Sequence, residues 1–426
     1  MVEGWKEISL NEIGWFKGAG VNKLSNIDEH PVYLINYMDV YKHWQIYFNN
    51  NYQEVTAKER EKKEANLLVG DILFTPSSEK PIDIGHAGII MEEMPDCVYS
   101  YHLIRYRLND KSKFDMNFIS YLLNSDEVQK HFVSRASGSG IRYTLSLNDF
   151  KSLKIRFPKK TEQASIANIL SSVDEAIDSV KKSIEAAEKL KKSLMQNLLT
   201  GRMKPDGTFR TEEEFYEDEK FGKVPIGWEV KKVKELSDSV QYGLNQASSE
   251  NGEIPMLRMN NILKGKMTDF PLVYVDLNDT LLNQYKLAKG DILFNRTNSM
   301  DLVGKVGIFE LEGDFVFASY LIRVKVSPVN NSSYVNYALN SYPIQCSLRS
   351  KATPAVSQAN INSNSLRNTS ILIPINKDEQ DMIVSIISKI EEQINNKQNQ
   401  IITLERLKKS LMQNLLTGKV RVGEEI

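Results

Sequence analysis

The last helical segment of this chain occurs twice. Residues 190–201 read Leu-Lys-Lys-Ser-Leu-Met-Gln-Asn-Leu-Leu-Thr-Gly, and residues 407–418 repeat them letter for letter at an offset of 217. Because this offset is about half of the 426 residues, it indicates a tandem duplication of whole domains rather than a solenoid of short repeats. A duplicated chain of this length is expected to fold into two copies of one scaffold.

Weaker matches between the two halves keep the same spacing. The matching pairs are Gly4-Trp5 with Gly227-Trp228, 70–74 with 290–294, 85–89 with 304–308, 103–105 with 321–323, and 121–125 with 337–341. Between these pairs the halves differ in sequence. We therefore expect one scaffold that carries two different surfaces.

Composition places the chain among ordinary globular proteins, with 41% hydrophobic and 26% charged residues. No apolar run reaches the ~18 residues that a membrane span requires, and residues 1–5 lack the basic and apolar parts of a signal peptide. Cys97 and Cys346 have no neighbouring metal-ligand spacing. These features predict a cytoplasmic protein without a zinc site or a membrane partner.

Each half begins with a region rich in short strands. Apolar and β-branched runs between Gly, Pro and Asn residues predict strands at 32–35, 71–74, 88–90, 101–106 and 153–157, and at 292–294, 306–309, 321–326 and 371–373. Short helices are expected at 114–124 and 334–341. The predicted fold class is α+β, with two β-rich domains in tandem.

A long amphipathic helix follows each β-rich region. Apolar residues recur at alternating steps of four and three, which is the heptad spacing of a coiled coil. The predicted pairing residues are Ile166, Leu170, Val173, Ile177 and Ile184 in the first helix, and Ile383, Ile387, Ile390, Ile394 and Ile401 in the second. Leu190 and Leu407 continue these two stripes. We expect the helices to pair as an antiparallel, pseudo-two-fold coiled coil; the alternative is that each helix packs only on its own β-rich domain.

These patterns divide the chain into six segments. The segments are a first domain (1–157), a central helix (158–201), an acidic linker (202–227), a second domain (228–374), a C-terminal helix (375–418) and a tail (419–426). Gly201 and Gly418 are expected to end the helices.

Charge is unevenly distributed although the net charge is only −1. Residues 128–160 contain eight Lys and Arg against one acid, and 345–377 contain four against none. In contrast, 206–220 contain seven acids and two bases. A charged face exposed to solvent would explain any one of these three stretches. The same acid-poor stretch at the same place in both halves instead favours a local surface that faces phosphate groups.

The order of elements resembles the specificity subunits of type I restriction–modification enzymes. A β-rich domain is followed by Pro158 or Pro374, an acid-Gln pair and a long helix that ends in Leu-Leu-Thr-Gly. The segment from Gly290 to Ser299, running into 302–308, is similar to the strand-loop-strand motif of the target recognition domains in that family. The first half keeps 70–74 but follows it with Thr-Pro-Ser-Ser instead of Asn-Arg-Thr-Asn.

The resemblance implies a non-catalytic DNA-binding subunit. Each recognition domain would read one half of a split, asymmetric target in double-stranded DNA, and the helices would set the gap between the halves. Two methylation subunits and motor-nuclease subunits would be the partners. S-adenosylmethionine, ATP and Mg²⁺ would bind those partners, and no cofactor would bind this chain.

Candidate DNA contacts are polar residues in loops, because base edges and phosphates are bound by Asn, Gln, Arg, Lys, Ser and Thr. In the first domain they are Lys17, Asn22, Lys23, Lys42, Arg135, Ser137 and Arg142. In the second they are Gln241, Tyr242, Asn245, Arg258, Asn260, Asn261, Asn295, Arg296, Thr297, Asn298, Lys351, Thr353 and Gln358, the last three within the loop 351–358. Any one of them could instead be a turn residue with no DNA contact.

Two other functions stay open at this point. One is an autonomous restriction enzyme or methyltransferase, although the sequence contains no Pro-Pro, no Gly-x-Gly-x-x-Gly and no P-loop motif. Pro205-Asp206 with Asp218-Glu-Lys220 matches a short nuclease pattern, but this segment is acidic and we expect no strand in it. The other is a coiled-coil adaptor that does not bind DNA. The two acid-poor stretches favour DNA binding over this alternative.

Overall fold

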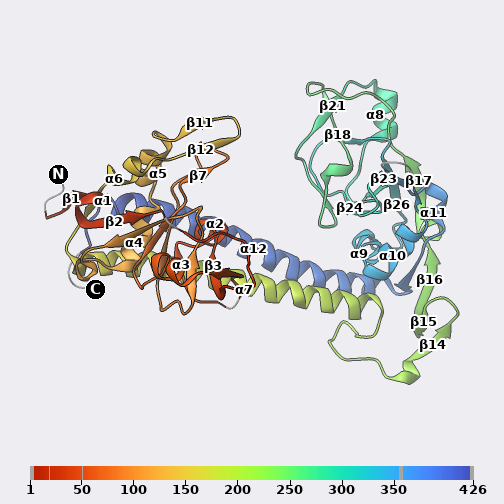
Figure 1. The fold of residues 1–426 in the computed structure, drawn as a ribbon. Helices are drawn as coiled ribbons and strands as arrows, with labels where there is room; N and C mark the ends of the chain where they lie inside the picture. The colour runs from red at the N-terminus through yellow and green to blue at the C-terminus, as the bar shows by residue number, and fades with distance from the viewer. Residues whose placement is uncertain (1–3, 19, 50, 355–357, 423–426) are drawn as a thin grey trace. The chain divides into compact units, whose positions relative to one another are not determined.

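The computed structural model describes residues 4–18, 20–49, 51–354 and 358–422, which form two compact units (Figure 1). Unit 1 contains Met1–Lys182 and Asn399–Ile426, and unit 2 contains Ser183–Gln398. Each unit therefore holds one β-rich domain and a part of each of the two long helices, α7 (Lys160–Leu199) and α12 (Lys377–Leu415). Each unit is described by itself.

The first domain contains thirteen strands among its described residues. They are β1 (Lys6–Ser9), β2 (Gly14–Lys17), β3 (His30–Ile35), β4 (Gln45–Ile46), β5 (Gln53–Ala57), β6 (Ile72–Phe74), β7 (Ser77–Ser78), β8 (Ala87–Ile90), β9 (Cys97–Tyr99), β10 (Ile104–Leu108), β11 (Ser137–Ser139), β12 (Arg142–Thr144) and β13 (Lys154–Phe157). Its helices are α1 (Leu10–Ile13), α2 (Tyr37–Lys42), α3 (Glu59–Glu64), η1 (Lys111–Lys113), α4 (Met116–Leu123), α5 (Asp126–Val133) and α6 (Leu147–Lys151).

The strands of unit 2 include a hairpin that precedes the second domain. They are β14 (Phe215–Asp218), β15 (Gly222–Pro225), β16 (Trp228–Lys232), β17 (Ser237–Tyr242), β18 (Ile254–Leu257), β19 (Ile262–Leu263), β20 (Lys266–Met267), β21 (Val273–Val275), β22 (Ile292–Asn295), β23 (Thr297–Asn298), β24 (Val306–Ile308), β25 (Val316–Phe317), β26 (Leu321–Val326), β27 (Thr353–Pro354), β28 (Ala359–Asn360) and β29 (Ser370–Pro374). The helices are η2 (Glu212–Glu214), η3 (Val233–Glu235), η4 (Met259–Asn261), α8 (Asp279–Tyr285), α9 (Ser332–Leu339), α10 (Tyr342–Ser350) and α11 (Ser363–Arg367).

The two domains share one sheet topology, as the duplication predicts. The main sheet runs β2-β10-β6-β8-β4 in the first domain and β17-β26-β22-β24-β20-β19 in the second. Each domain adds three smaller sheets: β1-β13, β5-β3-β9 and β11-β12-β7 in the first, and β16-β29, β21-β18-β25 and β23-β28-β27 in the second. The predicted α+β class with two β-rich domains is confirmed.

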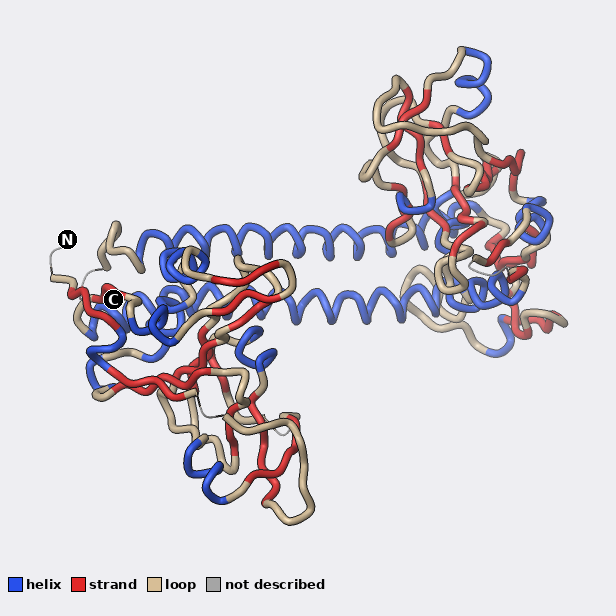
Figure 2. The backbone as a smooth tube through the Cα atoms, turned by 45° about the horizontal axis from the view of Figure 1, so that its top comes forward, coloured by secondary structure: helices blue, strands red, loops and turns tan. Residues whose placement is uncertain are grey.

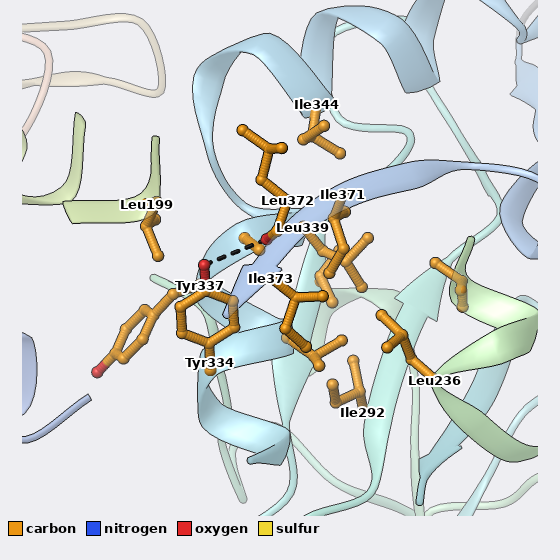
Figure 3. Close-up of a cluster of buried hydrophobic side chains, with 14 of the residues drawn as sticks. Leu199, Leu236, Ile292, Tyr334, Tyr337, Leu339, Ile344, Ile371, Leu372 and Ile373 are labelled. Carbon is orange, nitrogen blue, oxygen red and sulfur yellow. Dashed lines mark hydrogen bonds between the residues drawn. The ribbon is translucent and has the colours of Figure 1, made fainter. Parts of the chain in front are cut away.

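The core of unit 2 joins the sheet, two short helices and the end of α7 (Figure 3). Ile371 and Ile373 of β29 are buried beside Leu339 of α9, and Leu199 of α7 belongs to the same cluster. The hydroxyl of Tyr334, which is completely buried, donates to the Leu372 carbonyl at 3.1 Å. Since that bond satisfies the one polar group of the ring, a tyrosine can occupy the centre of the core.

The two long helices lie side by side and run antiparallel within each unit (Figures 1 and 2). In unit 1, Glu162 of α7 binds Arg421 and Asp174 of α7 binds Lys408, each at 2.7 Å. The residue number of the partner therefore falls as the residue number along α7 rises, which means that the two segments run in opposite directions. In unit 2, Lys191 of α7 binds Glu391 of α12 at 2.7 Å, and Leu198 shares a core cluster with Ile383. The prediction of antiparallel pairing is confirmed.

Most of the predicted pairing residues are shielded from solvent. Ile166, Leu170, Ile177, Ile383, Ile387, Ile390 and Ile394 are buried, and Val173, Ile184 and Ile401 are half-buried. Ile166 and Leu170 also belong to the core cluster of the first domain, and Ile383 and Ile387 to that of the second. The helix ends therefore pack on a β-rich domain as well as lying beside the other helix.

The predicted stripe is wrong at Leu190 and Leu407, which are 53% and 46% exposed. In each repeat the next residue turns inward instead: Lys191 pairs with Glu391, and Lys408 pairs with Asp174. The spacing of the apolar residues no longer alternates between four and three after Ala187, so it cannot keep one face on the partner helix.

A shared carboxylate joins both helices to the β-rich domain of each unit. In unit 1, Asp174 of α7 accepts the Tyr121 hydroxyl at 2.8 Å and binds Lys408 of α12 at 2.7 Å. The Lys408 ammonium also lies 4.5 Å from the centroid of the Trp44 ring. The same arrangement recurs in unit 2 among Glu391, Tyr337 (2.9 Å) and Lys191 (2.7 Å).

The Gln of each acid-Gln pair fixes the start of its helix. Gln163 is buried; its Oε1 accepts the Asp115 N–H and its Nε2 donates to the Pro158 carbonyl, both at 2.9 Å. The equivalent bonds in unit 2 join Gln380 to the Asn331 N–H (2.8 Å) and the Pro374 carbonyl (2.9 Å). Both helices are followed by the predicted glycines, Gly201 and Gly418, whose φ values of 66° and 70° suit a left-handed helix cap.

Our prediction that residues 202–227 contain no strand is wrong, because β14 and β15 form an antiparallel hairpin there. Phe215 and Tyr216 of β14 pair with Pro225 and Val224 of β15, and Val224 is completely buried in the core of unit 2. Asp218 accepts the N–H groups of Lys220 and Phe221 and so holds the turn. The strands are only four residues long and have no regular apolar alternation, so the acidic sequence did not predict them.

We predict that Gln163→Ala destabilises the protein by about 2 kcal/mol, because it leaves the Asp115 N–H without its partner in a buried place. Gln196→Ala, at an exposed position of the same helix, is the matched control. The free energy of unfolding from denaturant titration would measure both. Equal stability of the two variants would contradict the role assigned to Gln163.

Candidate nucleic-acid interface

Arg296 occupies a preordered position at the end of β22 in the second domain. Its backbone is fixed on both sides, since its N–H donates to the Tyr320 carbonyl (3.0 Å) and its carbonyl accepts the Ile361 N–H (2.9 Å). The guanidinium donates to Asn360 Oδ1 at 3.4 Å and lies 4.7 Å from the centroid of the Tyr242 ring. A half-buried guanidinium held in this way retains donors for an anionic or base-edge ligand.

Tyr242 is a 40% exposed aromatic residue beside this guanidinium. Its hydroxyl oxygen accepts the Ser363 N–H at 2.9 Å. Burial alone would raise the pKa of Tyr242, but this bond and the charges of Arg296 and Arg367 hold the pKa below its usual value. The surface around Arg296 is therefore positive and partly aromatic, which suits nucleic-acid contacts.

In the first domain the corresponding small sheet, β11-β12-β7, carries Arg142. Its Nη2 donates to Ser77 Oγ of β7 at 2.9 Å. Burial lowers the pKa of the neighbouring His102, and the positive charges of Lys23 and Arg142 lower it further. Lys23 and Arg142, two of the predicted residues, thus each act on the charge of His102, although they come from distant parts of the chain.

Two predicted contacts, Asn261 and Asn295, are wrong because neither side chain has exposed surface. Asn261 Oδ1 accepts the Arg258 N–H at 2.9 Å, and its Nδ2 donates to the Pro271 carbonyl at 3.0 Å. Asn295 Nδ2 donates to the Leu302 carbonyl at 3.3 Å. Both residues hold a loop in place from within.

The other candidates of the second domain lie in several environments. Asn245, Asn260, Thr353 and Gln358 are exposed, whereas Arg258, Thr297 and Asn298 are half-buried. Gln241 accepts a bond from Arg323. Lys351 donates to Thr369 Oγ1 at 3.3 Å, and burial and the nearby Lys220 lower its pKa. Part of the predicted loop, 355–357, lies outside the described residues.

The remaining candidates of the first domain are also dispersed. Asn22 is exposed next to Lys23, and Lys42 is exposed at the end of α2, the helix that carries Tyr37. Lys17 lies 3.7 Å from Glu64, and Ser137 bonds across its hairpin to Thr144 at 3.4 Å. Arg135 donates to the His131 carbonyl at 3.2 Å, where it caps α5. These contacts leave the candidates as predictions without a common site.

The acid-poor stretch 128–160 does not form one positive surface. Lys154 and Arg156 on β13 lie 3.7 and 3.6 Å from Glu7 on the adjacent β1, and Arg156 also binds Glu127. They line a cavity of about 320 Å³ together with Arg135. Because residues from elsewhere supply acids, the excess of basic residues in the sequence overstates the charge of the surface.

Three residues at these sites escaped the sequence analysis. Asn360 on β28 and Tyr37 on α2 lie beside Arg296 and Arg142, respectively, and His102 lies near Arg142. Asn360 occurs in the run Asn360-Ile-Asn362-Ser-Asn364, whose repeated Asn residues were a usable signal. No local pattern marks Tyr37 or His102, because only the fold brings them to Arg142.

The short nuclease-like pattern has a local structural explanation. Asp206 Oδ1 accepts the Thr208 N–H at 2.8 Å, and Asp218 holds the hairpin turn. Within the described part of the chain, no group of three or more His, Cys, Asp and Glu residues could hold a metal ion. Nor does any described helix have an apolar stretch long enough to cross a membrane.

Comparison with known proteins identifies the scaffold. The family model "Type I restriction modification DNA specificity domain" matches residues 2–189 and 225–406, so it matches both repeats separately. The chain belongs to this family. Similar relatives include the MjaIX and MjaVIII type I restriction enzyme specificity subunits of Methanocaldococcus jannaschii. The first is 26% identical and covers 99% of this chain and 94% of its own; the second is 29% identical and covers 88% and 83%.

Solved structures of the family share the fold. The S subunit of a type I restriction-modification system from M. genitalium superposes with a TM-score of 0.52 at 15% identity, covering 96% of both chains. A chain from a study of type I R-M complex assembly and conformational transition gives 0.58 at 14% identity, covering 98% of this chain and 99% of that one. The predicted resemblance to type I specificity subunits is confirmed.

We predict that replacing Asn295 affects stability more than replacing the adjacent Arg296. Asn295→Ala removes a buried bond and should lower the free energy of unfolding by about 1–2 kcal/mol. Arg296→Ala should change it by less than about 1 kcal/mol, because a half-exposed stacked guanidinium contributes little. Denaturant unfolding of both variants would measure the difference. A larger loss for Arg296→Ala would show that Arg296 serves the fold.

Proposed function

We propose that this chain is the DNA sequence-specificity subunit of a type I restriction–modification enzyme. Each β-rich domain reads one half of a split, asymmetric target in double-stranded DNA. The observation that carries this proposal is that one specificity-domain model matches both repeats, while the polar residues on corresponding sheets differ. Arg296 faces Asn360 in the second domain, whereas Arg142 faces Ser77 in the first. Two different surfaces on one scaffold suit two different half-sites.

In this proposal the chain itself is not catalytic. The partner subunits bind S-adenosylmethionine, ATP and Mg²⁺ and carry out methylation and cleavage. The sequence contains no P-loop, no dinucleotide-binding glycine motif and no Pro-Pro from a methyltransferase motif, which supports this division of labour.

The partners in this proposal are two methylation subunits that dock on the long helices, joined by motor-nuclease subunits. The duplicated dodecamer supports two copies of one partner, because its residues have the same exposure in both repeats. Packing explains identity at buried positions but not at exposed ones. The identical exposed residues are Leu190, Lys192, Ser193 and Gln196, and Leu407, Lys409, Ser410 and Gln413. Two equal exposed faces, each with a large apolar residue at one position, suit two equal partners.

We predict that methylation dependent on this chain occurs at a split, asymmetric motif. Sequencing the methylome of the host with and without the gene would reveal the motif. The two halves should differ, because the two domains present different side chains on equivalent sheets. A single continuous motif, or a palindromic one, would contradict the proposal.

The helices also set the gap between half-sites in this proposal. Both are uninterrupted, over 40 and 39 residues, which corresponds to roughly 60 Å for each at 1.5 Å per residue. A helix of this length is stiff enough to act as a spacer.

We predict that lengthening both helices by four residues widens the gap. The insertions belong after Lys182 in α7 and after Gln398 in α12, where both helices pass from one unit to the other. Four residues add roughly 6 Å, which is about two base pairs along DNA. The methylome should keep both half-sites and change only the gap. An altered half-site with an unchanged gap would refute the spacer role, and four exposed substitutions without insertion serve as the control.

A further inference from the structure

The small sheets β11-β12-β7 and β27-β28-β23 are equivalent in the two domains. Ser77 follows Phe74 of the main sheet by three residues, as Thr297 follows Phe294. In the first sheet Ser77 pairs with Thr144, and in the second Thr297 pairs with Asn360. Position by position, β7 therefore corresponds to β23 and β12 corresponds to β28.

In each sheet one arginine side chain reaches from one strand of this pair to the other. The strand that supplies the arginine differs between the two domains. In the second domain Arg296 immediately precedes β23 and reaches Asn360 on β28. In the first domain the residue before Ser77 is Pro76, which has no charge. There Arg142 on β12 supplies the guanidinium and reaches back to Ser77 on β7. The sequence alignment of the repeats hides this equivalence because the arginine has changed strand.

The surroundings of the two guanidinium groups also correspond. Arg296 lies against the Tyr242 ring. Arg142 is a neighbour of Tyr37: burial raises the pKa of this tyrosine, and the charge of Arg142 opposes the rise. At each small sheet an arginine thus meets a short polar residue of the facing strand, and a tyrosine from another element, Tyr37 of α2 or Tyr242 of β17, acts on or lies against the guanidinium.

Arg142 has the donors that recognition of a base requires. It is exposed, and within the described part of the chain its side chain makes one hydrogen bond, to Ser77, so most of its five N–H donors face solvent. A guanidinium fixed on one side presents its remaining donors as a fork, which matches the O6 and N7 acceptors of guanine in the major groove.

We propose that Arg142 determines specificity in the first domain by contacting a guanine edge, as the counterpart of Arg296 in the second, with Ser77 as the residue that positions it. This inference rests on the proposed function, because it assigns a residue to the half-site that the first domain reads. Arg142 and Arg296 are therefore expected to act on different halves of the target.

The test uses the whole chain in complex with its methylation partners. The variants are Arg142→Ala, Arg142→Lys and, as the matched variant of the other domain, Arg296→Ala. Methylome sequencing gives the motif, and a gel shift with duplexes altered at one base pair gives the discrimination. Arg142→Ala should reduce discrimination at one guanine-containing pair of one half-site by roughly tenfold to a hundredfold and leave the other half-site unchanged. Arg142→Lys should do the same, because it keeps the charge but loses the fork.

Three outcomes would overturn the inference. Equal weakening on all sequences, with wild-type binding restored in Arg142→Lys, would show a phosphate contact only. An effect on the half-site that Arg296→Ala also alters would refute the assignment to the first domain. Unchanged discrimination in both Arg142 variants would remove Arg142 from recognition. Failure of the proposed function would differ from all three, because the wild-type complex would then show no split motif at all.

Discussion

A carboxylate shared among three elements is the interaction on which each unit depends. Asp174 in unit 1 and Glu391 in unit 2 each bind a lysine of the antiparallel helix and a tyrosine of the β-rich domain. Burial raises the pKa of Tyr121 and Tyr337, so both tyrosines stay protonated and donate to the carboxylate. One acid thereby joins the helix pair to the β-rich domain of its unit.

The duplication made most of the fold predictable from the sequence. Strands such as β26, in which Ile322, Val324 and Val326 alternate with Arg323 and Lys325, and the two helices with their heptad spacing were visible because their periodicity is strong. The β14–β15 hairpin was not, because its two strands are only four residues long and have no regular apolar alternation, and β14 lies in a stretch with seven acids. The exposure of Leu190 could not be read from spacing either, since Lys191 turns inward to meet an acid on another helix.

The candidate site was predictable in composition but not in geometry. Asn295, the last residue of β22, and Arg296 are adjacent, yet the first is buried and the second presents a guanidinium. Loop-forming and ligand-binding roles use the same residue types, so only burial separates them. The pairing of Arg142 with Ser77 depends on a strand register across 65 residues of sequence, which no local pattern contains.

The lysine that completes each junction belongs to the duplicated dodecamer. The β-rich domain contributes a tyrosine on a short helix and, in unit 1, the Trp44 ring. The helical part of the junction, a carboxylate and a lysine, is thus the same in both repeats, although the two β-rich domains differ. A foreign domain could be exchanged into either place by recombination, provided that it offers both a tyrosine where Tyr121 or Tyr337 now stands and an apolar core that packs on the start of the long helix. The frame would then acquire a new target without any change in the surfaces that its partners recognise.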